Sequence, residues 1–262
     1  MMTNTIRELM TLFVLAEQGA PLAEKLLFPG ERAWMAGSLM QNAALLAPHV
    51  EDEDARYEAA LGTLSSAILA RIAFCERSLQ TAVVLGAKQY VILNAGFDLS
   101  PHRDGNWRRT METFIVDTPE MLAERAERFT ECGEGLRKYI YQVPAELAES
   151  AAALGEDARF DKEKVTFCSL LETADSLSIK ELEALIASLS PLLPLGSCIV
   201  MDYSAFSAAA VEALFDRCCF LAYEHLGKEE MQQQFFAAEA EKDPARRLSA
   251  PDGVRYIMAV KR

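Results

Sequence analysis

The chain has 262 residues, of which 51% are hydrophobic, enough to build one large domain with a core and too many for disorder over most of the length. Its formal net charge of −13 would repel nucleic acids and anionic membranes, so neither is an expected partner. We find no uninterrupted apolar run of about 18 residues or more, the length typical of a membrane-spanning helix, and therefore expect none.

Residues 3–85 are predicted to be helical, because apolar side chains recur at intervals of three and four, as at Leu61, Leu64 and Ile68. The first segment, MMTNTIRELMTLFVLAEQG, is interrupted by charged residues and lacks a basic start and a small-residue cleavage site. It is typical of an amphipathic helix of the mature protein and not of a signal peptide. Pro29-Gly30 and the acidic run 51–54 are predicted to break the region into separate helices.

After residue 85, short β-rich runs alternate with helical segments. The predicted strands are Gln89–Leu93, Thr113–Val116, Tyr139–Val143, Val165–Leu170, Ser197–Met201, Phe220–Tyr223 and Arg255–Val260. The predicted helices are Pro119–Thr130, Ala145–Leu154, Ile179–Leu192, Ala205–Arg217 and Lys228–Glu241. This alternation predicts an α/β fold with a mostly parallel, seven-stranded sheet covered by helices on both faces. Residues 1–85 would form a helical N-terminal cap on the Rossmann-like core of residues 86–262, as one continuous domain.

The six cysteines include no pair of C-x-x-C motifs and none with a nearby histidine, so no metal site is predicted. Several lie inside apolar runs, as in VTFCSLL and GSCIVMDY, and are interpreted as buried free thiols. Such thiols favour a reducing compartment, so we expect a cytoplasmic protein.

The first predicted strand leads into Asn94-Ala95-Gly96-Phe97-Asp98, a turn of small residues that would let a ligand approach the backbone. The second strand ends at Asp117, where an acidic side chain can bind ribose hydroxyls or, alternatively, cap the next helix. A dinucleotide would require a G-x-G-x-x-G turn for its pyrophosphate, whereas this turn has one glycine and a nearby carboxylate. S-adenosylmethionine has a ribose but no phosphate, and suits the turn better than the nicotinamide cofactor of an oxidoreductase does.

These segments resemble the leucine carboxyl methyltransferase-like family. The resemblance lies in Ala70-Arg71-Ile72, in the run Gly86–Asp98 and in Phe114-Ile115-Val116-Asp117-Thr118-Pro119, and continues weakly to Ala250-Pro251-Asp252-Gly253-Val254. It implies a Rossmann-like class I methyltransferase that uses S-adenosylmethionine and releases S-adenosylhomocysteine.

The resemblance also implies roles for individual residues. Arg71 would pair with the carboxylate of the cofactor, unless it is a surface arginine. The backbone of Asn94, Ala95 and Gly96 would line the amino-acid and ribose portions, and Asp117 would hold the ribose hydroxyls.

Further cofactor contacts are implied for Glu146, near the adenine, and for Leu171 and Glu172, beside the sulfonium. Glu146 could equally be a solvated charge at a helix start. The family commonly has glycine where this chain has Asn94, and Glu-Gly-x-x-x-Tyr-Leu where it has Leu171–Leu177, so the acidic residue is displaced by one position. These departures indicate an altered acceptor or a loss of activity.

No catalytic residue can be assigned from the sequence. A carboxylate acceptor is already nucleophilic, whereas a hydroxyl or an amine would need a base, for which His102 is a weak candidate. Asp202 and Tyr203, at the end of the fifth strand, could contact the acceptor. The hypothesis is O-methylation of a small-molecule or peptide carboxylate; the alternative is a diverged binding or partner subunit without transfer activity. The exposed side of the N-terminal helices could serve as an acceptor lid or as a homodimer surface.

Overall fold

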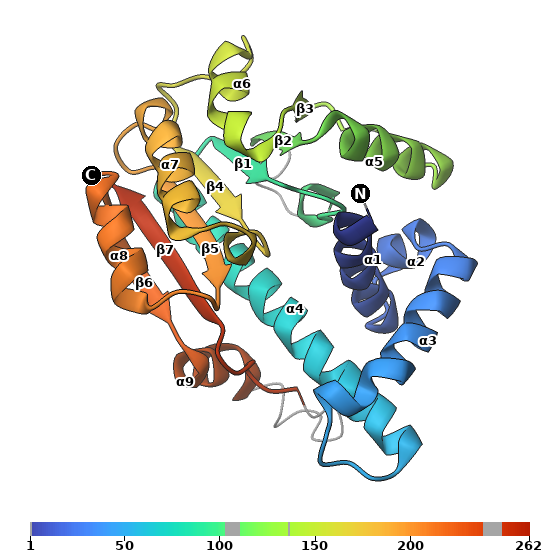
Figure 1. Cartoon of the computed structure of the whole chain (residues 1–262). Helices are drawn as coiled ribbons and strands as arrows, with labels where there is room; N and C mark the ends of the chain where they lie inside the picture. The colour runs from blue at the N-terminus through green and yellow to red at the C-terminus, as the bar shows by residue number, and fades with distance from the viewer. Residues whose placement is uncertain (1, 103–110, 136, 238–247) are drawn as a thin grey trace.

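The computed structural model describes residues 2–102, 111–135, 137–237 and 248–262 (Figure 1). Its centre is a seven-stranded sheet in the order β3-β2-β1-β4-β5-β7-β6. Strands β1 to β5 are parallel, and β7 pairs antiparallel with both β5 and β6. The strands are β1 Gln89–Leu93, β2 Glu112–Asp117, β3 Ile140–Pro144, β4 Thr166–Leu170, β5 Cys198–Tyr203, β6 Phe220–Leu226 and β7 Arg255–Lys261. The predicted Rossmann-like, mostly parallel fold is confirmed.

Helices cover both faces of this sheet, as the continuously apolar strands predict. Val91 and Leu93 of β1 face a cluster formed with α6 (Ser150–Glu156), α7 (Ile179–Leu189) and α8 (Ala208–Arg217). Tyr90 and Ile92 face the opposite cluster, formed with α4 (Glu53–Val84), α5 (Pro119–Glu131) and α9 (Lys228–Met231). Successive side chains of a strand point to opposite faces, so β1 joins both halves of the core.

Two predicted helices begin later than expected. The segment expected to be helical from residue 145 continues the strand path, because the Ala145 N–H donates to the Asp117 carbonyl, and α6 starts at residue 150 after a 3-10 turn. Helix α8 starts at residue 208 because the Ser207 side chain caps it by accepting from the Ala210 N–H. The helix predicted over 228–241 is observed as α9 and a π-helical turn to residue 236, and its end lies outside the described residues.

Four helices precede the sheet: α1 Met2–Glu17, α2 Pro21–Leu26, α3 Pro29–Leu46 and α4. Pro29 begins α3, and Asp52 caps α4 by accepting from the Ala55 N–H at 2.9 Å. Leu12 and Phe13 of α1 are buried in one cluster with Phe97 and Phe129 of the core region. The N-terminal helices therefore share a hydrophobic core with the segment that follows β1.

Helix α4 is long and apolar enough to cross a membrane by length and composition alone, with a mean hydropathy of 1.3 over its most apolar window. We expected no helix with these properties from the sequence. Ala70, Phe74 and Leu79 of this helix pack in one cluster with Tyr90 and Phe167 of the sheet. Packing against the sheet accounts for the apolar composition of this half of α4.

We predict that Phe13→Ala lowers the free energy of unfolding by about 3 kcal/mol, because it removes a side chain that is only 1% exposed and leaves a cavity. Urea denaturation followed by circular dichroism measures this change. Trp34→Ala on α3 is the control: Trp34 is 49% exposed, and its loss should change stability by no more than about 0.5 kcal/mol. Equal effects of the two substitutions would contradict the shared core.

Candidate functional site

The turn after β1 lies at the point where the sheet order reverses, between β1 and β4, which is where ligands bind in open α/β sheets. Two of its residues have left-handed backbone angles: φ is 52° at Asn94 and 50° at Gly96. Asparagine tolerates this conformation better than most residues do. Asn94 stands where the resembling family has glycine. Its left-handed backbone angle is one that glycine adopts readily, so the backbone of the turn is kept.

Gly96 is enclosed on two sides. Its N–H donates to Asp117 Oδ2 at 2.7 Å, and a Cβ added to it would lie 2.4 Å from Glu8 Cγ. The second oxygen of Asp117 accepts from the Thr118 N–H at 2.8 Å. Thr118, not Asp117, caps α5. Asp117 thus binds the turn directly, and burial raises the pKa of its carboxyl above the usual value.

Arg125 holds the other side of the turn. Its guanidinium donates to the Gly96 carbonyl at 2.7 Å and to the Asp98 carbonyl at 2.6 Å, and its side chain is 1% exposed. Burial lowers the pKa of Arg125 to about 10, against the opposing charges of Asp98 and Asp117. The backbone angles of the turn are therefore fixed by side chains of β2 and α5 as well as by its own residues.

A second cluster joins α4 to the ends of β4 and β5. The Arg71 guanidinium binds Asp202 Oδ2 at 2.7 Å and Glu172 Oε2 at 3.1 Å. Burial alone would lower the pKa of Arg71, but the charges of Asp202 and Glu172 raise it. Burial raises the pKa of the Glu172 carboxyl, while Arg71 acts in the opposite direction.

Glu172 has a φ of 56°, a left-handed value that costs a non-glycine residue roughly 1 kcal/mol. Three contacts hold it there: its ion pair with Arg71, its N–H to Asp202 Oδ1 at 2.7 Å, and its carbonyl, which accepts from Arg7 at 3.0 Å. Glu172, which stands where the family has glycine, thus keeps a backbone conformation that favours glycine. Its contacts with Arg71, Asp202 and Arg7 offset the strain.

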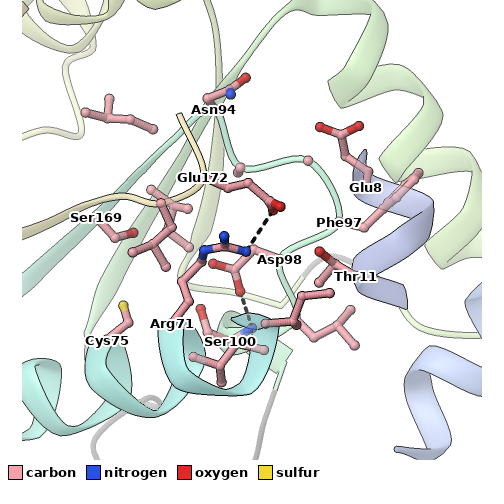
Figure 2. Close-up of a pocket in the computed structure, with 18 of the residues that line it drawn as sticks. Glu8, Thr11, Arg71, Cys75, Asn94, Phe97, Asp98, Ser100, Ser169 and Glu172 are labelled. Carbon is pink, nitrogen blue, oxygen red and sulfur yellow. Dashed lines mark hydrogen bonds and ion pairs between the residues drawn. The ribbon is translucent and has the colours of Figure 1, made fainter. Parts of the chain in front are cut away.

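Arg71, Glu172 and the residues of the turn line one cavity, which opens between α1, α4, the turn and the end of β4 (Figure 2). Among the residues expected to bind the cofactor, Arg71, Asn94, Ala95, Gly96, Leu171 and Glu172 line it. Asp117 lies behind Gly96, and Asp202 lies behind Arg71, so both contact the lining without belonging to it. Their direct contacts with a ligand stay predictions.

Three other expected site residues lie elsewhere. Glu146 is exposed before the 3-10 turn that precedes α6. His102 is 5% exposed and packs on the Phe129 ring, and Tyr203 places its hydroxyl 2.5 Å from His225 Nε2 on β6. None of the three lines the cavity, so the structure gives no support to their proposed ligand contacts.

The residues that the sequence reasoning missed include Arg7, Glu8 and Thr11 of α1, which line the cavity, and Arg125. Arg7 and Glu8 were visible only as charges that interrupt an apolar helix. Arg125 carried no signal, because a single arginine in an amphipathic helix is ordinarily solvated.

Comparison with known proteins matches residues 19–188 to the family described as leucine carboxyl methyltransferase. YktD of Bacillus subtilis (strain 168), named as a candidate S-adenosyl-L-methionine-dependent methyltransferase, is 28% identical over 232 residues, covering 76% of this chain and 74% of YktD. The crystal structure of a DUF574 family protein from Streptomyces avermitilis superposes with a TM-score of 0.55 at 14% identity, covering 90% of this chain and 92% of that one. That likeness concerns the fold.

We predict that Gly96→Ala weakens binding of S-adenosylhomocysteine by tenfold or more, since the new methyl group meets Glu8 Cγ and strains a residue with φ of 50°. Calorimetric titration measures the loss. Gly62→Ala is the control: Gly62 lies within α4 and has no atom near an added Cβ, so binding should not change.

The buried side chain of His102 makes the stability of the protein depend on pH. Burial, and then the charges of Arg125 and Arg137, lower the pKa of His102 to about 3 from its ordinary 6.5. The unfolded chain therefore binds this proton first, and the free energy of unfolding falls as the pH drops below 6.5, by at most about 1.4 kcal/mol per unit. His102→Phe should flatten this dependence between about pH 6.5 and 5, a range above most carboxyl titrations. Identical slopes of wild type and variant in urea denaturation would contradict it.

Proposed function

This chain belongs to the leucine carboxyl methyltransferase family, and from that premise we propose that it methylates a carboxylate oxygen of a small molecule or peptide. It is an S-adenosylmethionine-dependent methyltransferase with a Rossmann-like class I fold. The observation that carries the proposal is the cavity at the β1–β4 edge, whose charged groups suit this cofactor.

The charges of the cavity complement those of S-adenosylmethionine. Among its described lining residues are two arginines, Arg7 and Arg71, and four carboxylates: Glu8, Glu76, Asp98 and Glu172. The cofactor carries an ammonium, a sulfonium and one carboxylate, so its net positive charge meets a net negative site. Arg71 would hold the cofactor carboxylate with the part of its guanidinium that Glu172 now binds.

The acceptor is inferred from the lack of histidine, the commonest general base, among the described residues that line the cavity. No histidine is found among its described lining residues: His102 is packed against Phe129, and His225 is engaged by Tyr203 and Glu212. A carboxylate acceptor is ionised at neutral pH and needs no base. These observations support a carboxylate over a hydroxyl or an amine.

When bound, S-adenosylmethionine supplies an electrophilic methyl group beside the acceptor oxygen. The work of this chain is then to orient the two reactants and to exclude water. The turn, held by Asp117 and Arg125, fixes one side of the site, and Glu172, held by Arg71 and Asp202, fixes the other. Helix α1 covers the turn through Glu8.

We predict that Arg71→Gln weakens S-adenosylhomocysteine binding by tenfold or more, because it removes a charged partner of the cofactor carboxylate. Titration calorimetry measures the dissociation constants. Arg32→Gln is the matched control, because Arg32 forms an exposed ion pair with Glu17 that contributes little. Wild type that binds neither S-adenosylmethionine nor S-adenosylhomocysteine would refute the cofactor assignment for this cavity.

The acceptor has its own test. Incubation of the protein with labelled S-adenosylmethionine and a cell extract should give labelled products whose methyl group is released as methanol by mild base. Carboxylic methyl esters hydrolyse under these conditions, whereas methyl ethers and methylamines do not. A product that keeps its label through base treatment would refute the carboxylate acceptor while leaving the methyltransferase activity intact.

A further inference from the structure

Glu8 of α1 lines the cavity, and its buried carboxylate has one unused oxygen. Its side chain is 5% exposed, and Oε1 accepts from Arg7 Nη2 at 2.6 Å. The other oxygen, Oε2, is buried and has no hydrogen-bond partner among the described residues, although buried polar atoms ordinarily have one. Both residues precede the region 19–188 that the family comparison matches, so that match assigns them no role.

Arg7 fixes where this carboxylate lies. Its guanidinium donates to Glu8 through two nitrogens and to the Glu172 carbonyl through a third, at 3.0 Å. The Asn94 amide, with its oxygen on this side, accepts from Arg7 Nη2 at 2.9 Å. Arg7 therefore lies between Glu8 and the end of β4, and it ties the first helix to both walls of the cavity.

Glu8 lies beside the turn that runs from Asn94 to Phe97 (Figure 2) and lines the cavity. Asp117 accepts the Gly96 N–H but does not belong to the lining. Both Asp117 oxygens already accept backbone N–H groups, of Gly96 and of Thr118. A ribose presents two hydroxyl donors to this turn. Of the two carboxylates next to Gly96, Glu8 is the one that has a free oxygen and lines the cavity.

We propose that Glu8 Oε2 accepts a hydrogen bond from a ribose hydroxyl of the cofactor, which makes α1 a part of the cofactor site. This inference rests on the proposed function, because it assumes that S-adenosylmethionine occupies the cavity. Arg7 is a positioning residue that keeps the Glu8 carboxylate over the turn. The cofactor ammonium is the other donor to consider, but the amino-acid end belongs with Arg71 and Glu172, on the far side of Arg7.

The raised affinity of Glu8 for a proton fits this role. Burial raises the pKa of the Glu8 carboxyl, the charge of Asp117 acts in the same direction, and Arg7 opposes both. A hydroxyl donor would relieve the cost of burying the charge without adding a net charge of its own. It would also give a partner to Oε2, the oxygen that Arg7 leaves unbonded.

The test compares Glu8→Gln with wild type for three ligands: S-adenosylhomocysteine and its analogues that lack the 2′- or the 3′-hydroxyl. We expect Glu8→Gln to weaken S-adenosylhomocysteine binding about tenfold, since a bond to a charged acceptor is replaced by one to an amide. For the analogue that lacks the bonded hydroxyl, the two proteins should bind equally well. Glu17→Gln, on the same helix but with its side chain on Arg32, is the matched control and should bind as wild type does.

Three results would overturn the inference. Glu8→Gln could bind S-adenosylhomocysteine as wild type does, or it could weaken all three ligands equally, which would indicate the ammonium or a structural role. In either case wild-type binding would leave the proposed function standing. Wild type that does not bind S-adenosylhomocysteine would overturn both. If thermal unfolding shows that Glu8→Gln does not fold, Glu8→Asp replaces it. This variant keeps the charge but shortens the side chain by one methylene. It should likewise bind S-adenosylhomocysteine more weakly than wild type does, and bind the analogue that lacks the bonded hydroxyl equally well.

Discussion

The hydrogen bond from the Gly96 N–H to Asp117 Oδ2 is the contact on which the site depends. It joins the end of β1 to the end of β2, and the Gly96 carbonyl is held from the other side by Arg125 of α5. Glu8 then packs against the face of Gly96 that has no side chain. Any larger residue at this position would displace one of these three groups. At Gly96, therefore, the first helix α1, the ends of strands β1 and β2, and helix α5 all make contact.

Around this contact the structure buries more charge than a hydrophobic core ordinarily holds. Arg7, Arg71 and Arg125 each bind backbone carbonyls or carboxylates of the site. The Asp202 carboxylate also accepts the Glu172 N–H. Burying these ions costs solvation, which their hydrogen bonds offset only when the geometry is good. As a result, the polar groups of the site are oriented before a ligand binds. Methyl transfer requires such orientation, because both reactants must be held in position.

Two of the departures from the family pattern lie at the non-glycine residues of the site that have left-handed backbone angles. Asn94 and Glu172 take φ values of 52° and 56°, at positions where the resembling family has glycine. Their side chains contribute contacts that a glycine lacks: Asn94 reaches Thr173 at 2.9 Å, and Glu172 reaches Arg71. The departures therefore retain the backbone shape of the site and change its polar lining.

The sequence by itself determined the strands, the order of elements and the cofactor turn, because these depend on local periodicity and on short motifs. The pattern from Gly86 to Asp98 and the acidic end of β2 identified the turn and Asp117 correctly as neighbours. The starts of α6 and α8 were missed because a strand hydrogen bond and a serine cap decide them. Arg7, Glu8 and Arg125 entered the site only in the folded chain: Arg7 meets Glu172 across 165 positions, and Arg125 meets Gly96 across 29. Contacts over such separations leave no periodic trace, so only the tertiary structure could decide which charges are buried together.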